Sequence, residues 1–511
     1  MKKALLFHYL FFNVFYIVAL VFLSRFNLNG MTDDTYYLSS IYNFWNLGRL
    51  DLAIDRGIFN NFLANHFNPM LIILSPLAYI FPKPLHLLTA INYIFIALWY
   101  MASIYIIIKV YGEKVYINLK FSFSFFILFF IFSATLFNTF INYNGLHSVL
   151  FAMPFLTLAH YFLFINRSYI LAVLFYLPAL LTKEEYWLLF IFFSLSVFIM
   201  SKEKKYLLLF FGSLIGFYLV YAQLMPWLGG GVKGVHIGHY NYLIDALSLD
   251  QAWKNFISLP QLLKKGFLLV LFFLPALFLL NGKLYYKEWR SNIGLILSIS
   301  PTIGYCYLSS QASMSYFTHE HYSLPIISVL FALIINNIST INRLSIIFYI
   351  MINLVIIMLV LYFKQPWQYA SYQDEPVLQE KILPKLNLNY TDYLLVDDRT
   401  GVYFSHYQVD YFSNISNKHY RYEQPKYIII NTRYIFLRNN TGKKNDFLVD
   451  TYEYLRGIKE LANYEIIISI YPFLVFVPIK DRISSHSSLS KFELKNWDIK
   501  SFKSNVWLKN Y

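Results

Sequence analysis

Long apolar segments separated by short polar stretches recur along the first 363 residues. A transmembrane α-helix needs about 20 predominantly apolar residues to cross a bilayer. Several segments are shorter, so their helices must include flanking Tyr, Ser and His residues. The pattern predicts an α-helical polytopic membrane protein with about eleven transmembrane helices. The predicted spans are residues 4–23, 87–108, 121–137, 149–165, 169–181, 186–200, 206–225, 266–280, 293–308, 323–335 and 344–363.

The N-terminal apolar segment has two interpretations. Lys2 and Lys3 precede residues 4–23, which is the charge arrangement of a secretory signal peptide. A cleavage site of the small-x-small type is missing, and the segment is long enough to span a bilayer. We therefore expect an uncleaved membrane anchor.

The run from Phe67 to Phe81 is ambiguous, because four prolines interrupt or follow it. Placing it outside the membrane puts nearly all basic clusters on the side of the N-terminus, as the positive-inside rule requires. We expect a juxtamembrane helix near residues 67–82, within an external loop spanning residues 24–86. Lys264 and Lys265 are the main exception to this topology. The clusters predicted to be cytoplasmic are Lys2 and Lys3; Lys109, Lys114 and Lys120; Arg167; Lys202, Lys204 and Lys205; Lys283, Lys287 and Arg290; and Arg343.

The composition becomes polar after about residue 363. Short apolar runs at 393–396, 427–430 and 465–468 predict strands, and the apolar spacing in 450–462 predicts a helix. Residues 364–511 are therefore predicted to form a small soluble α/β domain, following a transmembrane domain of residues 1–363. An odd number of spans with a cytoplasmic N-terminus makes this domain extracytoplasmic.

Composition supports a membrane protein. Hydrophobic residues make up 58% of the chain and charged residues 14%, against about a quarter charged in ordinary soluble proteins. The net charge of +14 comes largely from the clusters that set the topology, so we expect no nucleic-acid partner. The single cysteine, Cys306, excludes an intramolecular disulfide and a multi-thiolate metal site.

Under this topology the ionisable connectors lie mostly on the external side, and no carboxylate lies deep within a span. Asp33 and Asp34 follow the first span and can act as a general base or contribute to a cation site, or else cap the next helix. His66 lies ahead in the same loop, before Pro69.

Two further constellations follow in later external connectors. Lys183, Glu184 and Glu185 form either a substrate-binding group or an interfacial charge cluster. His319, Glu320, His321 and Tyr322 are typical of a metal or phosphate site, and equally of a hydrated aromatic loop. His147 is a weaker binding candidate, for which a helix-start hydrogen bond is the alternative.

The order of these features resembles the GT-C superfamily of membrane glycosyltransferases, which use polyprenyl-phosphate sugars. The resemblance covers residues 1–340 loosely, and is greatest to an uncharacterised prokaryotic branch of that superfamily. One departure from that branch is that Ile41 and Tyr42 stand where it has Asp and Gln. The Asp33-Asp34 pair matches the broader superfamily. The features that match the branch are the segment from His66 to Pro69, Lys183 with Glu184, and His321 with Tyr322.

The resemblance implies transfer of a sugar from a polyprenyl-phosphate donor to an acceptor at the external face of the cytoplasmic membrane. It implies that Asp33 or Asp34 is the base, that Lys183 stabilises the departing phosphate, and that the other connectors bind substrate. Mg²⁺ or Mn²⁺ is a candidate cofactor, with Asp34, His319, Glu320 and His321 as possible ligands. The alternatives are a transporter or flippase of lipid-linked saccharides, using mid-membrane residues such as Asn92 and Gln223, and a non-catalytic assembly protein.

Overall fold

The computed structural model describes eleven stretches of the chain and two isolated positions. Within them the protein is mostly helical, with a small sheet near the C-terminus. The described stretches are residues 2–24, 32–50, 62–135, 148–229, 287–308, 324–337, 377–396, 400–411, 425–431, 464–470 and 473–478, with isolated positions at 347 and 351.

The chain divides into two compact units. Unit 1 contains residues 1–20, 61–74 and 88–364. Unit 2 contains residues 21–60, 75–87 and 365–511, so parts of the predicted external loop belong with the C-terminal residues. The predicted domain boundary at residue 363 stays a prediction.

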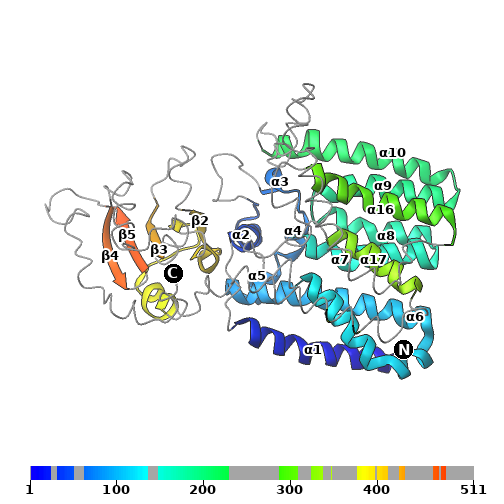
Figure 1. Cartoon of the computed structure of the whole chain (residues 1–511). Helices are drawn as coiled ribbons and strands as arrows, with labels where there is room; N and C mark the ends of the chain where they lie inside the picture. The colour runs from blue at the N-terminus through cyan, green and yellow to red at the C-terminus, as the bar shows by residue number, and fades with distance from the viewer. Residues whose placement is uncertain are drawn as a thin grey trace, which may run out of the picture. The chain divides into compact units, whose positions relative to one another are not determined.

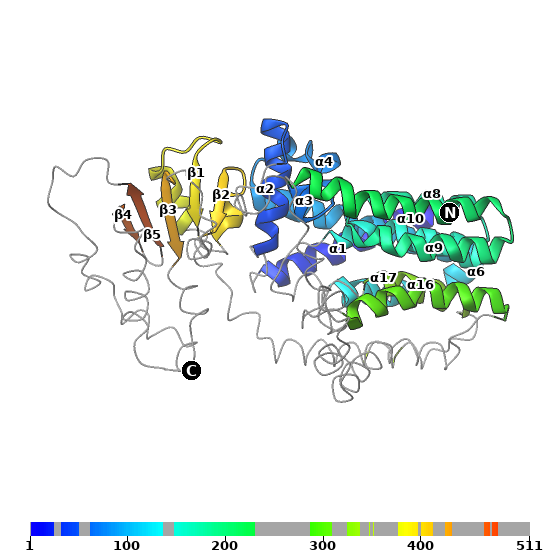
Figure 2. The same ribbon diagram turned by 90° about the horizontal axis from the view of Figure 1, so that it is seen from above.

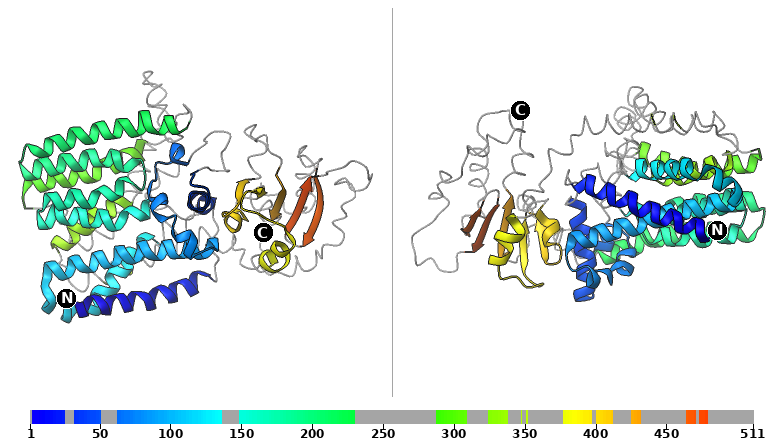
Figure 3. Two further views of the ribbon diagram at one scale, coloured as in Figure 1. Left: turned by 180° about the vertical axis from the view of Figure 1, so that it is seen from behind. Right: turned by 90° about the horizontal axis from the view of Figure 1, so that it is seen from below.

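Unit 1 is a bundle of helices whose axes run side by side (Figure 1). Helix α9 packs against both α10 and α16, and α7 packs against α8 and α17 (Figure 3). Polar contacts also join helices: His160 Nδ1 lies 2.9 Å from Ser328 Oγ, between α7 and α17. The helices are α1 (Lys2–Ser24), α3 (Phe62–Asn65), α4 (Met70–Leu74), α6 (Pro84–Thr135), α7 (Val149–Tyr161), α8 (Tyr169–Leu180), α9 (Glu185–Ser201), α10 (Lys205–Tyr218), α11 (Met225–Leu228), α16 (Trp289–Leu308) and α17 (Leu324–Asn337).

Three described helices are long and apolar enough to cross a membrane: Pro84–Gly112, Val149–Asn166 and Lys205–Leu228. Each coincides with a predicted span. Five further apolar helical segments among the described residues have 10–17 residues. The structure therefore confirms a protein with several apolar helices, and the number of eleven spans stays a prediction. The predicted span 266–280 and almost all of 344–363 lie outside the described residues.

Two predicted spans, 87–108 and 121–137, are joined without a regular loop. Helix α6 runs through both and is broken at Gly112, where φ is +73° and ψ is 168°. Glycine adopts positive φ without the steric cost of a Cβ atom. The polar residues around Lys109 and Lys114 therefore lie in helical segments on either side of Gly112.

The proline-interrupted run after Phe67 forms two short helices, α4 and α5 (Leu77–Ile80). They contain five and four residues, far fewer than a membrane crossing needs. Pro76 precedes α5, where the missing proline N–H costs no helical hydrogen bond. The external position of this segment stays a prediction.

Unit 2 contains a five-stranded mixed sheet in the order β2-β1-β3-β5-β4 (Figure 2). Strands β1, β2 and β3 pair in parallel, whereas β5 pairs antiparallel with β3 and β4. All four residues of β1 are buried, as expected for a central strand. The three predicted strands are confirmed, and the predicted helix 450–462 lies outside the described residues. The strands are β1 (Tyr393–Val396), β2 (Gln408–Tyr411), β3 (Tyr427–Asn431), β4 (Tyr464–Ile470) and β5 (Phe473–Pro478).

Helix α2 (Thr32–Leu47) also belongs to unit 2. It packs against α5 and against the short 3₁₀ turn Thr400–Phe404 that precedes β2. The helix is buried from Thr35 to Asn43, apart from partly exposed Tyr36. A helix from the first predicted external loop is therefore part of the same compact unit as the C-terminal sheet.

Candidate functional site

A buried polar cluster lies in unit 1, where the connection between α8 and α9 meets the segment before α4. The connection is polar because the apolar run of α8 ends at Leu180 and that of α9 begins after Glu185. Lys183 is 3% exposed and Glu184 is fully buried. Burying charged groups is costly unless they are paired, so their partners define the site.

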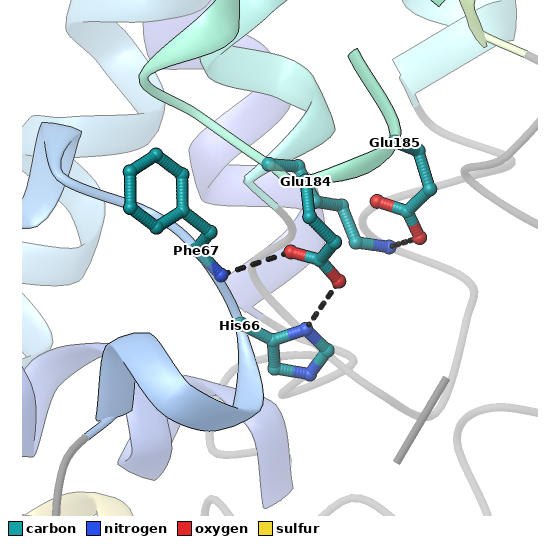
Figure 4. A network of polar contacts seen from close by, with 5 residues as sticks. His66, Phe67, Glu184 and Glu185 are labelled. Atoms are coloured by element: carbon teal, nitrogen blue, oxygen red, sulfur yellow. Dashed lines mark hydrogen bonds and ion pairs between the residues drawn. The ribbon is translucent and has the colours of Figure 1, made fainter. Parts of the chain in front are cut away.

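Glu184 holds the turn that contains His66 and Phe67 (Figure 4). The backbone N–H of Phe67 donates to Glu184 Oε2 at 2.9 Å, and His66 Nδ1 lies 3.2 Å from Glu184 Oε1. Three residues further on, the Met70 N–H donates to the Leu181 carbonyl at 2.8 Å. The two segments are therefore joined both by a side chain and through the backbone.

The Phe67 side chain fixes the same turn from its apolar side. It packs with Val220, in the helical turn Leu219–Leu224 after α10, and with Met225 at the start of α11, while Trp187 and Leu224 pack around them. Burial of one large apolar side chain contributes about 1.5–3 kcal/mol. The turn is thus anchored both to the α8–α9 connection, through Glu184, and to the C-terminal part of the Lys205–Leu228 helix.

Lys183 pairs with the second carboxylate of the cluster. Its Nζ lies 2.9 Å from Glu185 Oε1, and Glu185 is 12% exposed (Figure 4). Within the described part of the chain, Glu185 Oε2 and both polar atoms of fully buried Asn68 have no hydrogen-bond partner. Buried polar groups normally bond to protein, water or a ligand. Asn68 and Glu185 therefore have hydrogen-bonding capacity for a further molecule.

The electrostatics of the cluster keep His66 neutral at physiological pH. Burial and the nearby Lys183 ammonium lower the pKa of His66 to about 3, while Glu185 acts in the opposite direction. A neutral imidazole that donates through Nδ1 to a carboxylate has its acceptor lone pair on Nε2. His66 thus contributes hydrogen bonding to the cluster, and Lys183 contributes the positive charge.

The opposite ends of α8 and α9 have a different character. Arg167 Nη2 lies 3.2 Å from Glu288 Oε2, and the Tyr169 hydroxyl donates to the Met200 carbonyl at 3.0 Å. Helix α9 has 17 residues, so its length separates Lys183 from the basic residues after Ser201 by about 26 Å. One end of the described bundle therefore carries the basic residues that follow Ser201, and the opposite end of the helices carries the His66–Glu184 cluster.

A family match covers most of the chain. Residues 33–389 match the family described as "Predicted membrane protein (DUF2079)". The chain belongs to this family. The DUF2079 region begins at Asp33, includes the whole His66–Glu184 cluster, and ends before strand β1. No curated protein matches the chain at a significant level.

The structure brings four of the predicted site residues of this DUF2079 protein together: His66, Lys183, Glu184 and Glu185. Asp33 and Asp34 lie in the first turn of α2, in unit 2, and their side chains are outside the described set. The remaining predicted residues also lie outside the described residues; they are His147, His319, Glu320, His321 and Tyr322.

Two residues of the cluster were missed from the sequence. Asn68 was noted only as part of the His66–Pro69 segment, and Phe67 contributes a backbone donor that no side-chain pattern reveals. A polar residue beside a proline in an otherwise apolar run was the available signal for Asn68. Among the described residues, no group of three His, Cys, Asp or Glu residues is arranged to hold a metal ion.

Proposed function

We propose that this membrane protein is a GT-C-like glycosyltransferase that moves a sugar from a polyprenyl-phosphate donor to an acceptor at the external membrane face. One observation carries the proposal. The His66–Pro69 segment and the Lys183-Glu184 pair, which carry part of the resemblance, are bonded to each other although 117 and 118 residues separate the bonded partners. They form a buried polar cluster at the end of α9 opposite to the basic residues that follow Ser201.

The proposed reaction needs a base and a cation. The acceptor oxygen attacks the anomeric carbon, and the bond from that carbon to the phosphate oxygen breaks. Asp33 or Asp34 takes the acceptor proton, which is general-base catalysis. Lys183 stabilises the negative charge that develops on the leaving polyprenyl phosphate.

The cluster supports different roles for its members. Because His66 is neutral, we assign it to hydrogen bonding with the substrate, and because Glu184 binds His66 and Phe67, we assign it to holding the binding turn. Glu185 keeps Lys183 in place. The other proposed binding residues are His147, His319, His321 and Tyr322. We also propose that Asp34, His319, Glu320 and His321 would hold a divalent cation.

The test is cleavage of a synthetic polyprenyl-phosphate sugar by the purified protein. We expect the wild-type protein to release polyprenyl phosphate. The rate of release should be lowered about 100-fold or more in Lys183→Gln, and also in either Asp33→Ala or Asp34→Ala, whichever removes the base. Glu203→Gln, an exposed ion-pair variant, is the matched control and should retain activity. Movement of the intact lipid across vesicles without cleavage, lost in Asn92→Ala, would favour the transporter alternative.

A further inference from the structure

Helix α2 is tied to the C-terminal sheet by a buried hydrogen bond. Gln408 Nε2, at the start of β2, donates to Asn43 Oδ1 of α2 at 2.7 Å. Asn43 is 3% exposed and Gln408 is 6% exposed. All these residues belong to unit 2. An amide pair withdrawn from water is sensitive to loss of either partner, because the other is then left unsatisfied.

The residue before Asn43 adds contacts to two further segments of the same unit. The Tyr42 hydroxyl donates to the Phe81 carbonyl at 2.8 Å, just after α5. The Tyr42 ring lies edge-on to His406, with 5.9 Å between ring centroids. Tyr42 and Asn43 therefore fix the second half of α2 to both the α5 segment and the residues around β2.

These contacts stabilise and position a helix that would be only marginally stable on its own. Helix α2 has 16 residues, and isolated helices of that length are marginal in water. Thr35, Ser39, Tyr42 and Asn43 follow one helical face, and all four are buried. Asp33 and Asp34 occupy the first turn of this helix, about 13 Å along its axis from the Tyr42–Asn43 contacts.

We propose that the C-terminal sheet is a positioning scaffold for α2, acting through Gln408 on Asn43, and that it thereby sets the position of Asp33 and Asp34. The catalytic half of this inference rests on the proposed glycosyltransferase function. The scaffolding half rests only on the contacts within unit 2. Gln408 is a positioning residue and does not itself meet the substrate.

The first experiment measures amide hydrogen exchange in the full-length protein. Gln408→Ala and Asn43→Ala should each accelerate exchange of peptides covering residues 40–47 by about fivefold or more, with little change in α9. Gln379→Ala, at an exposed position of the same domain, is the matched control and should leave residues 40–47 unchanged. Unchanged exchange in Gln408→Ala overturns the scaffold, as does an equal acceleration in α9.

The second experiment measures transfer kinetics with the synthetic donor. Gln408→Ala should lower kcat by about tenfold and leave the donor KM unchanged, because the base is misplaced while the Lys183 cluster is intact. Equal kcat in Gln408→Ala and Gln379→Ala overturns the catalytic half. A wild-type protein with no transfer refutes the glycosyltransferase proposal instead, and the exchange experiment still decides the scaffold.

Discussion

Removal of the Glu184 carboxylate is the sharpest test of how the binding turn is held. The carboxylate is fully buried and accepts two hydrogen bonds, from Phe67 N–H and His66 Nδ1. Hydrogen bonds to charged groups contribute about 1.5–3 kcal/mol each, and without the carboxylate the two donors would remain buried without this acceptor. Glu184→Ala should therefore lower the free energy of unfolding by about 3–5 kcal/mol. Glu184→Gln should cost about half as much, because an amide offers one acceptor oxygen.

The measurement is equilibrium unfolding in mixed micelles, combined with hydrogen exchange of peptides covering residues 66–72. Glu203→Gln is the control, because Glu203 forms an exposed ion pair with Lys205 and its loss should change stability by no more than about 0.5 kcal/mol. Equal stability of Glu184→Ala and Glu203→Gln would refute the anchoring role of Glu184. Exchange protection at residues 66–72 that survives in Glu184→Ala would refute it independently.

Three further predictions concern protonation, packing and an unpaired hydroxyl. The free energy of unfolding should fall by up to about 1.4 kcal/mol per pH unit below about pH 6.5, because His66 binds a proton in the unfolded chain but stays neutral in the folded protein. Denaturant titrations at several pH values should show a weaker pH dependence of this free energy in His66→Gln than in the wild type. An identical pH dependence would contradict the neutral imidazole. Gly216→Ala should lower the melting temperature, since a Cβ would clash with the Trp187 ring, whereas Gly212→Ala meets no atom within 4 Å and should not. Thr35→Val should raise stability by about 1 kcal/mol, because the buried Thr35 hydroxyl has no partner among the described residues, and a loss of stability in unfolding curves would contradict this.

Much of the fold follows from local sequence patterns. The runs 393–396 and 427–430 are strands because consecutive β-branched and apolar residues suit a buried sheet, and the structure places β1 and β3 there. The three helices that are long and apolar enough to cross a membrane were predictable from length and hydropathy alone. The break at Gly112 was not predictable, because two helices joined by a polar loop and one helix broken at a glycine have similar sequence patterns.

Four residues of the buried cluster were predictable from the sequence, but their assembly was not. His66, Lys183 and Glu184 were selected for their chemistry and position, whereas the bonds from Glu184 to the His66–Phe67 turn cross more than 100 residues and leave no periodic signal. The grouping of α2 with the C-terminal sheet includes the amide pair of Asn43 with Gln408, which are 365 residues apart in sequence. Such contacts arise from tertiary packing, which composition and local spacing do not encode.

The most direct test of the account is the sidedness of the two ends of the Lys205–Leu228 helix. Trp227, two residues after the Met225 that packs with Phe67, and Lys204, at the basic end, are both exposed. In a Cys306→Ser background, a membrane-impermeant maleimide should label Trp227→Cys in intact cells and Lys204→Cys only after permeabilisation. Labelling of Lys204→Cys in intact cells, with Trp227→Cys protected, would put the His66–Glu184 cluster in the cytoplasm and contradict transfer at the external face.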